Sequence, residues 1–333
     1  MVRETKTTRL AIAGCGRAAE WLYVPALKSA RGVRLVAAVD PIAQRHELIA
    51  SQFDGCIATH SLEAMLDQVQ VDAMIVASPP AQHLPMLRTL VSAGLPALVE
   101  KPLAPSMQGL DEIAALVRQG EICIAVGYNR RFRDPVAKLR QVVQSRLPEQ
   151  PVHVRYVMTS DAVTWSPITG VIDPLEDLGS HQLDLLRFVF NREILTIAAE
   201  RPNKLTCDLH VTMSGGITAH CTCQQTDRAR EDMTIDCGGR HYKLNIGSER
   251  IAPAAGPLRQ ALDLADGVKR KLTRSRSSFK ASYTRQLEAF VAQVRGGEAS
   301  DALATFDDGV AVIQAVDAAR GAADRRNQEI HLT

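Results

Sequence analysis

The first residue whose type and place could do chemistry is a lysine at the predicted end of a strand. Lys101 follows the apolar run Ala97–Val99 and Glu100, and Pro102 comes next. Because proline cannot continue a strand ladder, the strand should end here. An ammonium group then lies at the carboxyl end of a strand, where open α/β sheets bind their ligands. A partly desolvated lysine there can take part in proton transfer, although a lysine at most strand ends is a solvated surface residue.

A second group combines two carboxylates with a histidine. Asp177, His181 and Asp184 follow one another at offsets of four and three, so a regular helix puts all three on one face. Histidine exchanges a proton near neutral pH, and a neighbouring carboxylate can orient it or a substrate. The structural alternative is a set of acids favoured by the dipole at a helix start, with one histidine satisfied in the core.

A glycine-rich turn near the N-terminus predicts a nucleotide site. The apolar segment Leu10–Ala13 leads into the Gly14–Ala19 turn and then a helical segment to about Ser29. The first glycine permits the tight turn, the second lets a pyrophosphate approach the backbone, and Ala19 is small enough for helix–strand packing. The pyrophosphate would lie at the helix N-terminus, where Arg17 could add a charged contact.

Asp40 ends the predicted second strand, Val33–Val39, about 20 residues beyond the turn. A carboxylate there suits the two ribose hydroxyls of NAD and repels the 2′-phosphate of NADP. Arg45 and His46 are close enough in sequence to approach that 2′-phosphate, so NADP stays open as the less favoured alternative. Asp–Pro is also a common turn opener, which is the structural interpretation of Asp40.

The elements that must position these residues alternate in the first third of the chain. Apolar runs at 73–77, 97–99 and 121–126 are separated by helical segments, which predicts a doubly wound parallel sheet. We expect an N-terminal Rossmann domain at 1–127. Residues 128–333 should form an α+β domain with an open, mostly antiparallel sheet, giving an α/β protein overall. Its predicted strands are 151–158, 204–213, 217–225, 233–237 and 242–246.

Composition and charge exclude several classes of partner. The 333 residues are 46% hydrophobic with a formal net charge of +2, which gives no case for nucleic acid or a membrane surface. No apolar run reaches the ~20 residues that span a bilayer, and the polar N-terminus does not resemble a signal peptide. Seven scattered cysteines suggest reduced thiols and a cytoplasmic protein. Cys221 and Cys223 are interpreted as apolar lining of a strand, so no metal site is predicted. His210 and His220 fall on the more polar face of their predicted strands.

Taken together, these motifs resemble the Gfo/Idh/MocA family of glucose–fructose oxidoreductases, inositol dehydrogenases and rhizopine-catabolism proteins. The matching motifs occur in the family's order and cover nearly the whole chain. They are Gly14-Cys-Gly16, Asp40, Ser78-Pro79 with His83, Glu100-Lys101-Pro102, Gly127–Phe132, Asp177-x-Gly179-x-His181-x-x-Asp184, and a C-terminal pattern from Phe290 to Asp308-Gly309.

The resemblance implies a nicotinamide cofactor and substrates among sugars, sugar nucleotides, inositols and related polyols. It assigns Lys101 to the reacting hydroxyl or the cofactor, and it assigns Asp177 and His181 to substrate orientation and proton transfer. A homodimer or homotetramer is implied too, as is a Lys101–Pro102 bond that is cis in similar proteins. The cofactor-binding residues that it implies are Gly14, Gly16, Arg17, Ala18, Asp40, Ser78, Pro79, His83, Glu100 and Asn129.

We therefore predict reversible hydride transfer from a carbinol carbon to nicotinamide, with Lys101 or His181 as the base. One alternative is a redox-neutral glycosidase that uses tightly held NAD, and another is a non-catalytic NAD-sensing regulator. The basic residues at 269–280 match no family motif. They form either a solvated face or a contact for a phosphate-bearing substrate, and Trp165 is placed like a substrate wall.

Overall fold

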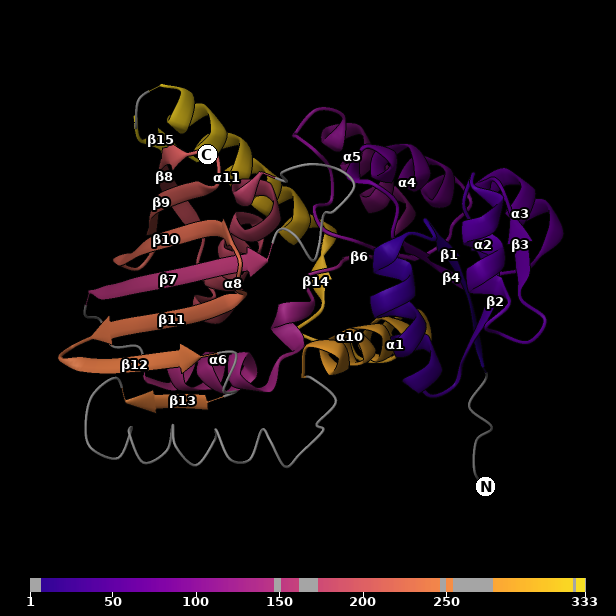
Figure 1. Ribbon diagram of the computed structural model, residues 1–333, viewed down its shortest axis with the longest axis horizontal. Coiled ribbons are helices and arrows are strands. Elements are labelled where there is room, and N and C mark those ends of the chain that lie inside the picture. Colours follow the sequence, from indigo (N-terminus) through magenta and orange to yellow (C-terminus); the bar gives the residue numbers. More distant parts are fainter. Residues whose placement is uncertain are drawn as a thin grey trace. The chain divides into compact units, whose positions relative to one another are not determined.

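The chain, seen in a computed structural model, forms two compact units (Figure 1). The first comprises Met1–Phe132 and Ser277–Ala311, and the second Arg133–Arg276 and Val312–Thr333. Trp165 and residues 269–277 lie outside the described part of the chain, so their contacts with a substrate stay predictions. The residues that the structure describes are 7–146, 151–161, 173–245, 250–253, 278–325 and 328–332.

The first unit is built on a seven-stranded sheet in the order β14-β6-β5-β4-β1-β2-β3. β1 to β6 run parallel, and β14 pairs antiparallel with β6. This strand order is that of a dinucleotide-binding fold, and it reverses between β1 and β4, where such sheets bind ligands. The strands are β1 (Thr8–Ala13), β2 (Val33–Val39), β3 (Ile57–Thr59), β4 (Ala73–Val76), β5 (Ala97–Val99), β6 (Ile124–Val126) and β14 (Ala304–Thr305).

Helices connect these strands and return from the C-terminal part of the chain. A π-helical turn, η1, runs directly into α1, and α10 packs on α1 over a buried cluster shared with β1. The helical elements are η1 (Ala19–Tyr23), α1 (Val24–Ser29), α2 (Ala43–Ala50), α3 (Leu62–Gln68), η2 (Pro80–Gln82), α4 (His83–Ser92), α5 (Leu110–Gly120), η3 (Asn129–Phe132), α10 (Ser278–Val294) and the start of α11 (Phe306–Asp324).

The division of the chain differs from the predicted one, which places all of 128–333 in the second domain. In the structure the first unit extends to Phe132 and regains residues 277–311. The physical reason is burial: Tyr283, Leu287 and Phe290 of α10 belong to the same hydrophobic cluster as Leu10 of β1. An amphipathic helix shows that it has an apolar face, but its sequence does not say which sheet that face will meet.

The second unit contains an eight-stranded sheet in the order β13-β12-β11-β7-β10-β9-β8-β15 (Figure 1). β7 and β10 pair in parallel, and the other neighbours are antiparallel. The predicted fold class, a parallel N-terminal sheet followed by a mostly antiparallel one, is confirmed. The strands are β7 (Val152–Asp161), β8 (Ile194–Asn203), β9 (Thr206–Met213), β10 (Ile217–Thr226), β11 (Arg230–Cys237), β12 (Arg240–Asn245), β13 (Arg250–Pro253) and β15 (Ile330–His331).

β8 is additional to the predicted strands. Its register against β9 shifts between Ile194 and Thr196 and again between Glu200 and Asn203. Such irregularities interrupt the alternation of buried and exposed side chains that marks a strand in a sequence.

The helices of the second unit are α6 (Asp134–Arg146), the π-helical turn η4 (Leu175–Gly179), α8 (Ser180–Phe190) and the rest of α11. On β10, Cys221 and Cys223 are fully buried, as the apolar-lining interpretation expects. His210 and His220 are exposed on the other face, and their rings stack with centroids 4.6 Å apart. Among the described residues no helix is long and apolar enough to cross a membrane.

Candidate active site

Gly14 closes the turn after β1 in a conformation that glycine adopts more readily than other residues. Its φ is +86°, and its N–H donates to Val39 O at 2.8 Å. A Cβ added at Gly14 would lie 2.5 Å from Ser78 Cα and 2.6 Å from Ala77 C, inside the backbone that follows β4. The two segments at the switch point of the sheet therefore touch through their backbones, and this contact requires glycine.

Gly16 is surrounded differently, because a Cβ built on it would meet no heavy atom of the described chain within 4 Å. Its carbonyl accepts the first helical hydrogen bond, from Glu20 N at 3.0 Å, so the amides just before Glu20 stand at a helix start. Ala18 is the residue that precedes η1. Arg17 stacks its guanidinium over the Trp21 ring, 4.7 Å from the centroid. Open space beside helix-start amides is what a pyrophosphate needs.

Asp40 is buried with both carboxylate oxygens bound to backbone amides. Oδ2 accepts from Cys15 N at 2.8 Å, and Oδ1 accepts from Ile42 N at 2.9 Å. Each oxygen can accept a second hydrogen bond, so the carboxylate can still bind hydroxyls. His46 is buried, with Nδ1 2.6 Å from Asp40 O, whereas Arg45 is exposed.

His83 is fully buried and links the loops that follow β4 and β5. Its Nε2 lies 2.9 Å from Ser78 O, and its Nδ1 lies 2.9 Å from Pro102 O. Burial lowers the pKa of His83 more than the neighbouring carbonyl oxygens raise it. Because both nitrogens face backbone carbonyl oxygens, His83 fixes these two loops relative to each other, and its contact with a cofactor stays a prediction. Ser78 is buried beside it, and Pro79 is exposed.

Glu100 has both oxygens engaged inside the first unit. Oε1 accepts from Tyr23 Oη at 2.9 Å, and Oε2 accepts from Lys101 N at 2.9 Å. Burial raises the pKa of this carboxyl, opposed by the Lys101 charge and by both hydrogen bonds. The sequence predicted Glu100 as a cofactor contact and did not single out Tyr23. The observed bonds make the carboxylate a support beneath the Lys101 backbone.

Replacing Tyr23 with phenylalanine should make stability more dependent on pH. The raised pKa means that the folded state holds a proton on Glu100 where the unfolded chain has lost it, so stability falls as pH rises above the ordinary glutamate range. Tyr23→Phe removes a hydrogen bond that lowers this pKa, so the fall should extend to higher pH. Denaturant unfolding over that pH range measures it, with the same substitution in a Glu100→Gln background as control. Parallel curves for the wild type and Tyr23→Phe would contradict the coupling.

Lys101 itself is half-buried and its peptide bond to Pro102 is cis, as the resemblance implied. The loop beyond it continues into Leu103, which is fully buried. A Cβ added to Gly309, at the start of α11, would lie 2.9 Å from Leu103 Cδ2. The returning C-terminal segment therefore packs directly against the loop that carries the lysine.

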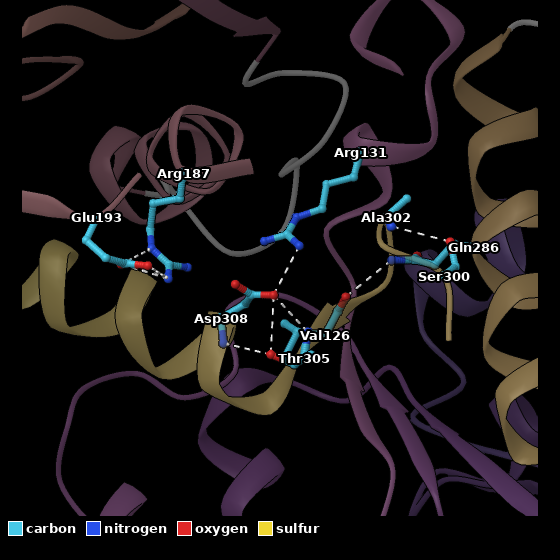
Figure 2. Close-up of polar contacts among 9 residues, drawn as sticks. All are labelled: Val126, Arg131, Arg187, Glu193, Gln286, Ser300, Ala302, Thr305 and Asp308. Carbon is cyan, nitrogen blue, oxygen red and sulfur yellow. Dashed lines mark hydrogen bonds and ion pairs between the residues drawn. The ribbon is translucent and has the colours of Figure 1, made fainter. Parts of the chain in front are cut away.

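Asn129, the first residue of η3 after β6, is fully buried. Its Nδ2 donates to Ser282 Oγ of α10 at 2.8 Å, and Ser282 Oγ donates to Phe279 O at 2.6 Å. Its Oδ1 accepts no hydrogen bond from the described part of the chain. Gln286, also on α10, donates from Nε2 to Val126 O at 3.2 Å (Figure 2). Together with the Asn129 amide, this bond ties α10 to the end of β6 and the start of η3.

Arg131, two residues after Asn129, binds the start of α11 (Figure 2). Its Nη1 lies 3.1 Å from Asp308 Oδ2, which also accepts from Thr305 N at 3.0 Å. Asp308 N donates in turn to Thr305 Oγ1 at 3.1 Å. This reciprocal pair is a capping box, and its Thr-x-x-Asp spacing is a signal that the sequence carries. The guanidinium partner could not be found from that spacing.

In the second unit, Asp177, His181 and Asp184 lie on one continuous helical segment made of η4 and α8. Asp173 begins it, because Asp173 Oδ1 accepts from Leu175 N at 2.9 Å. Asp177 is half-buried, whereas His181 and Asp184 are buried. The π-helical turn over 175–179 places more residues in a turn than the regular helix assumed for the sequence. Their alignment on one face therefore stays a prediction.

Comparison with known proteins identifies the family that the first unit matches. Residues 8–128 match the model of the GFO_IDH_MocA group, described as an oxidoreductase family with an NAD-binding Rossmann fold. Over these residues the chain matches the Gfo/Idh/MocA family. The resemblance inferred from the motifs is thereby confirmed, together with the NAD-binding fold of the first unit.

Curated relatives of the chain include several inositol 2-dehydrogenases. That of Mycolicibacterium smegmatis is 32% identical over 173 residues, which cover 51% of this chain and 49% of the relative. Inositol 2-dehydrogenase 4 of Saccharopolyspora erythraea is 28% identical over 174 residues, 51% of this chain and 50% of the relative. In these matches the chain spans about half the length of its curated relatives. A longer match, to the Rhizobium meliloti inositol 2-dehydrogenase, covers 97% of this chain and 99% of the relative at 22% identity.

Solved structures share the fold over almost the whole chain. The myo-inositol 2-dehydrogenase of Lactobacillus plantarum superposes with a TM-score of 0.79 at 18% identity, covering 98% of this chain and 100% of the other. The scyllo-inositol dehydrogenase of Lactobacillus casei, bound to NAD(H) and scyllo-inositol, gives 0.78 at 16% identity, covering 98% and 99%. At such identities the likeness establishes the fold, and the roles of individual residues stay predictions.

Proposed function

We propose that this chain is a member of the Gfo/Idh/MocA family and an NAD-dependent dehydrogenase of a sugar, sugar nucleotide or cyclitol. It would transfer a hydride between nicotinamide and a secondary alcohol or ketone. The observation that carries the proposal lies within the first unit. The glycine-rich turn follows β1 and Lys101 follows β5, so both stand at carboxyl ends of strands in one parallel sheet. That edge is where such sheets bind their ligands.

The residues of the first unit fit the cofactor. The space beside Gly16 leaves room for a pyrophosphate at the start of η1. Asp40 retains acceptor capacity for ribose hydroxyls, and its negative charge disfavours a 2′-phosphate. The Asn129 Oδ1 atom is a buried acceptor at the same edge of the sheet. The Asp40 charge supports NAD over NADP, while His83 and Glu100 would act by shaping the loops.

In the proposed mechanism the chain manages the reacting oxygen and its proton. Bound NAD would supply the hydride acceptor. The Lys101 ammonium would polarise the reacting oxygen and stabilise alkoxide charge as it develops. His181 is the preferred general base for oxidation, with Asp177 orienting the imidazole or the substrate. Lys101 is the alternative base.

The test begins with the cofactor and then the substrate. Absorbance and mass of any nicotinamide that co-purifies would identify it. Net NADH formation is then measured over cyclitols, free sugars and nucleotide sugars, with cyclitols first because the curated relatives are named inositol 2-dehydrogenases. NADH formation with one of these classes is the expected result. Glycoside cleavage without net NADH would indicate the redox-neutral glycosidase, and NAD binding without turnover would indicate the regulator.

We further propose a cytoplasmic homodimer or homotetramer. All seven cysteines are free thiols in the structure, which fits a reducing compartment. Light scattering of the purified protein tests the assembly, and a monomer across the working concentration range would contradict it.

A further inference from the structure

Gln182 is a fully buried amide on α8, one residue after His181, and all of its hydrogen bonds go to the sheet. Its Nε2 donates to Tyr156 O at 3.0 Å and to Thr222 O at 3.2 Å. Its Oε1 lies 2.8 Å from Cys223 Sγ, whose thiol donates to it. One side chain thus connects the helix to both β7 and β10, the parallel pair of the second sheet.

This arrangement gives α8 a fixed position that apolar packing alone would not give. Burying an amide is unfavourable unless its donors and acceptor are all paired, and here both N–H groups and the oxygen have partners. Hydrogen bonds hold only within narrow distances and angles, whereas apolar side chains can slide with little change in buried area. Compared with a leucine at the same place, Gln182 therefore also fixes the rotation of the helix about its axis and its position on the sheet.

The contact is close because the helix has little bulk where it meets β10. A Cβ added to Gly179 would lie 3.3 Å from Cys223 Sγ and 2.9 Å from Leu175 Cδ1. Every residue from Ser180 to Leu186 is buried, so α8 cannot shift without moving all of these side chains. His181 is next to Gln182 in the chain, so its ring moves with any change in the rotation of the helix.

We propose that Gln182, held by the Cys223 thiol, is the positioning residue for His181. The catalytic purpose of this positioning rests on the proposed function, because it assumes that the His181 imidazole handles the substrate proton. The contacts themselves lie wholly within the second unit. Loss of the amide or of its thiol partner should therefore change the environment of the imidazole in a protein that still folds.

The chain offers a matched set of variants. Gln182→Met keeps the length of the side chain and removes its hydrogen bonds. Cys223→Ala removes the donor to Oε1, whereas Cys223→Ser keeps a donor at the same place. Cys221→Ala is the control, because Cys221 is equally buried on the same face of β10 but is not a partner of Gln182.

The primary readout is independent of turnover: the titration of the His181 imidazole, followed by nitrogen-edited NMR and assigned with His181→Gln. Gln182→Met and Cys223→Ala should displace this titration, while Cys221→Ala and Cys223→Ser should follow the wild type. Unchanged His181 signals in folded Gln182→Met and Cys223→Ala would overturn the proposal. So would an equal displacement in Cys221→Ala, which would mean a general packing effect. If Gln182→Met does not fold, the three cysteine variants decide alone.

Kinetics then separate this proposal from the proposed function. With a substrate in hand, Gln182→Met should lower kcat about tenfold or more and alter its pH profile, with KM for NAD unchanged. A purely structural residue would lower stability and leave that profile as it is, which would overturn the positioning role. If the wild type oxidises no alcohol, the proposed function fails, and the NMR comparison still decides whether Gln182 positions His181.

Discussion

Lys101→Ala is expected to lower turnover about 10²- to 10³-fold while NAD still binds, because removing one group that stabilises developing oxyanion charge has an effect of this size. The cofactor contacts proposed for Gly16 and Asp40 do not involve the Lys101 side chain, so NAD affinity should change little. Stopped-flow hydride transfer and calorimetric NAD binding measure the two quantities. Lys28→Ala, which removes an exposed lysine of the same unit, is the control and should retain full activity.

His181→Ala is expected to lower kcat about 10²- to 10⁴-fold, which is the usual contribution of a general base. The pH dependence of kcat distinguishes the two candidate bases. If His181 takes the proton, His181→Ala should lose the rise of kcat with pH that a base produces, and Lys101→Ala should keep it. The opposite pattern would make Lys101 the base. Wild-type turnover in both variants would contradict the assignment of either residue.

The parts of this site that could be predicted from the sequence are those that depend on local structure. β2 and β5 have the predicted bounds, and β1 differs only at its start, since short apolar runs between turn residues define strands well. Lys101 stands at a strand end because proline follows it. β6 is shorter than predicted because Glu121 closes α5 with a positive φ of 48°, which its type does not announce.

The supporting contacts could not be predicted, because their partners are far apart in the chain. Tyr23 and Glu100 are separated by 77 residues, Asn129 and Ser282 by 153, and Cys223 and Gln182 by 41. Nothing local in either partner indicates the other. The π-helical turns at the starts of two functional helices are a related case. An extra residue per turn depends on tertiary packing, and such turns are frequent at functional sites.

A comparison of alanine substitutions at the two glycines of the turn should separate folding from cofactor binding. Gly14→Ala is expected to lower the free energy of unfolding by at least about 2 kcal/mol. Its φ is +86°, and the new Cβ would lie 2.5 Å from Ser78 Cα, so the strain of the conformation and a backbone clash combine. Gly94→Ala isolates the strain, because Gly94 has a φ of +68° with no heavy atom of the described chain within 4 Å of the new Cβ.

Gly16→Ala should leave the free energy of unfolding within about 0.5 kcal/mol of the wild type, because its Cβ would enter open space and its φ is ordinary. That space is where we place the pyrophosphate, so NAD affinity should fall about 10- to 100-fold, equivalent to roughly 1.4 to 2.8 kcal/mol of lost binding. Urea denaturation and calorimetric titration with NAD, run on all three variants, give the two free energies. Wild-type NAD affinity in Gly16→Ala would remove the pyrophosphate from this turn, and wild-type stability in Gly14→Ala would mean that β1 and β4 can separate without cost. The expected result is a loss of stability in Gly14→Ala and a loss of NAD affinity in Gly16→Ala. It would show that the same short turn joins the strands through Gly14 and receives the cofactor through Gly16.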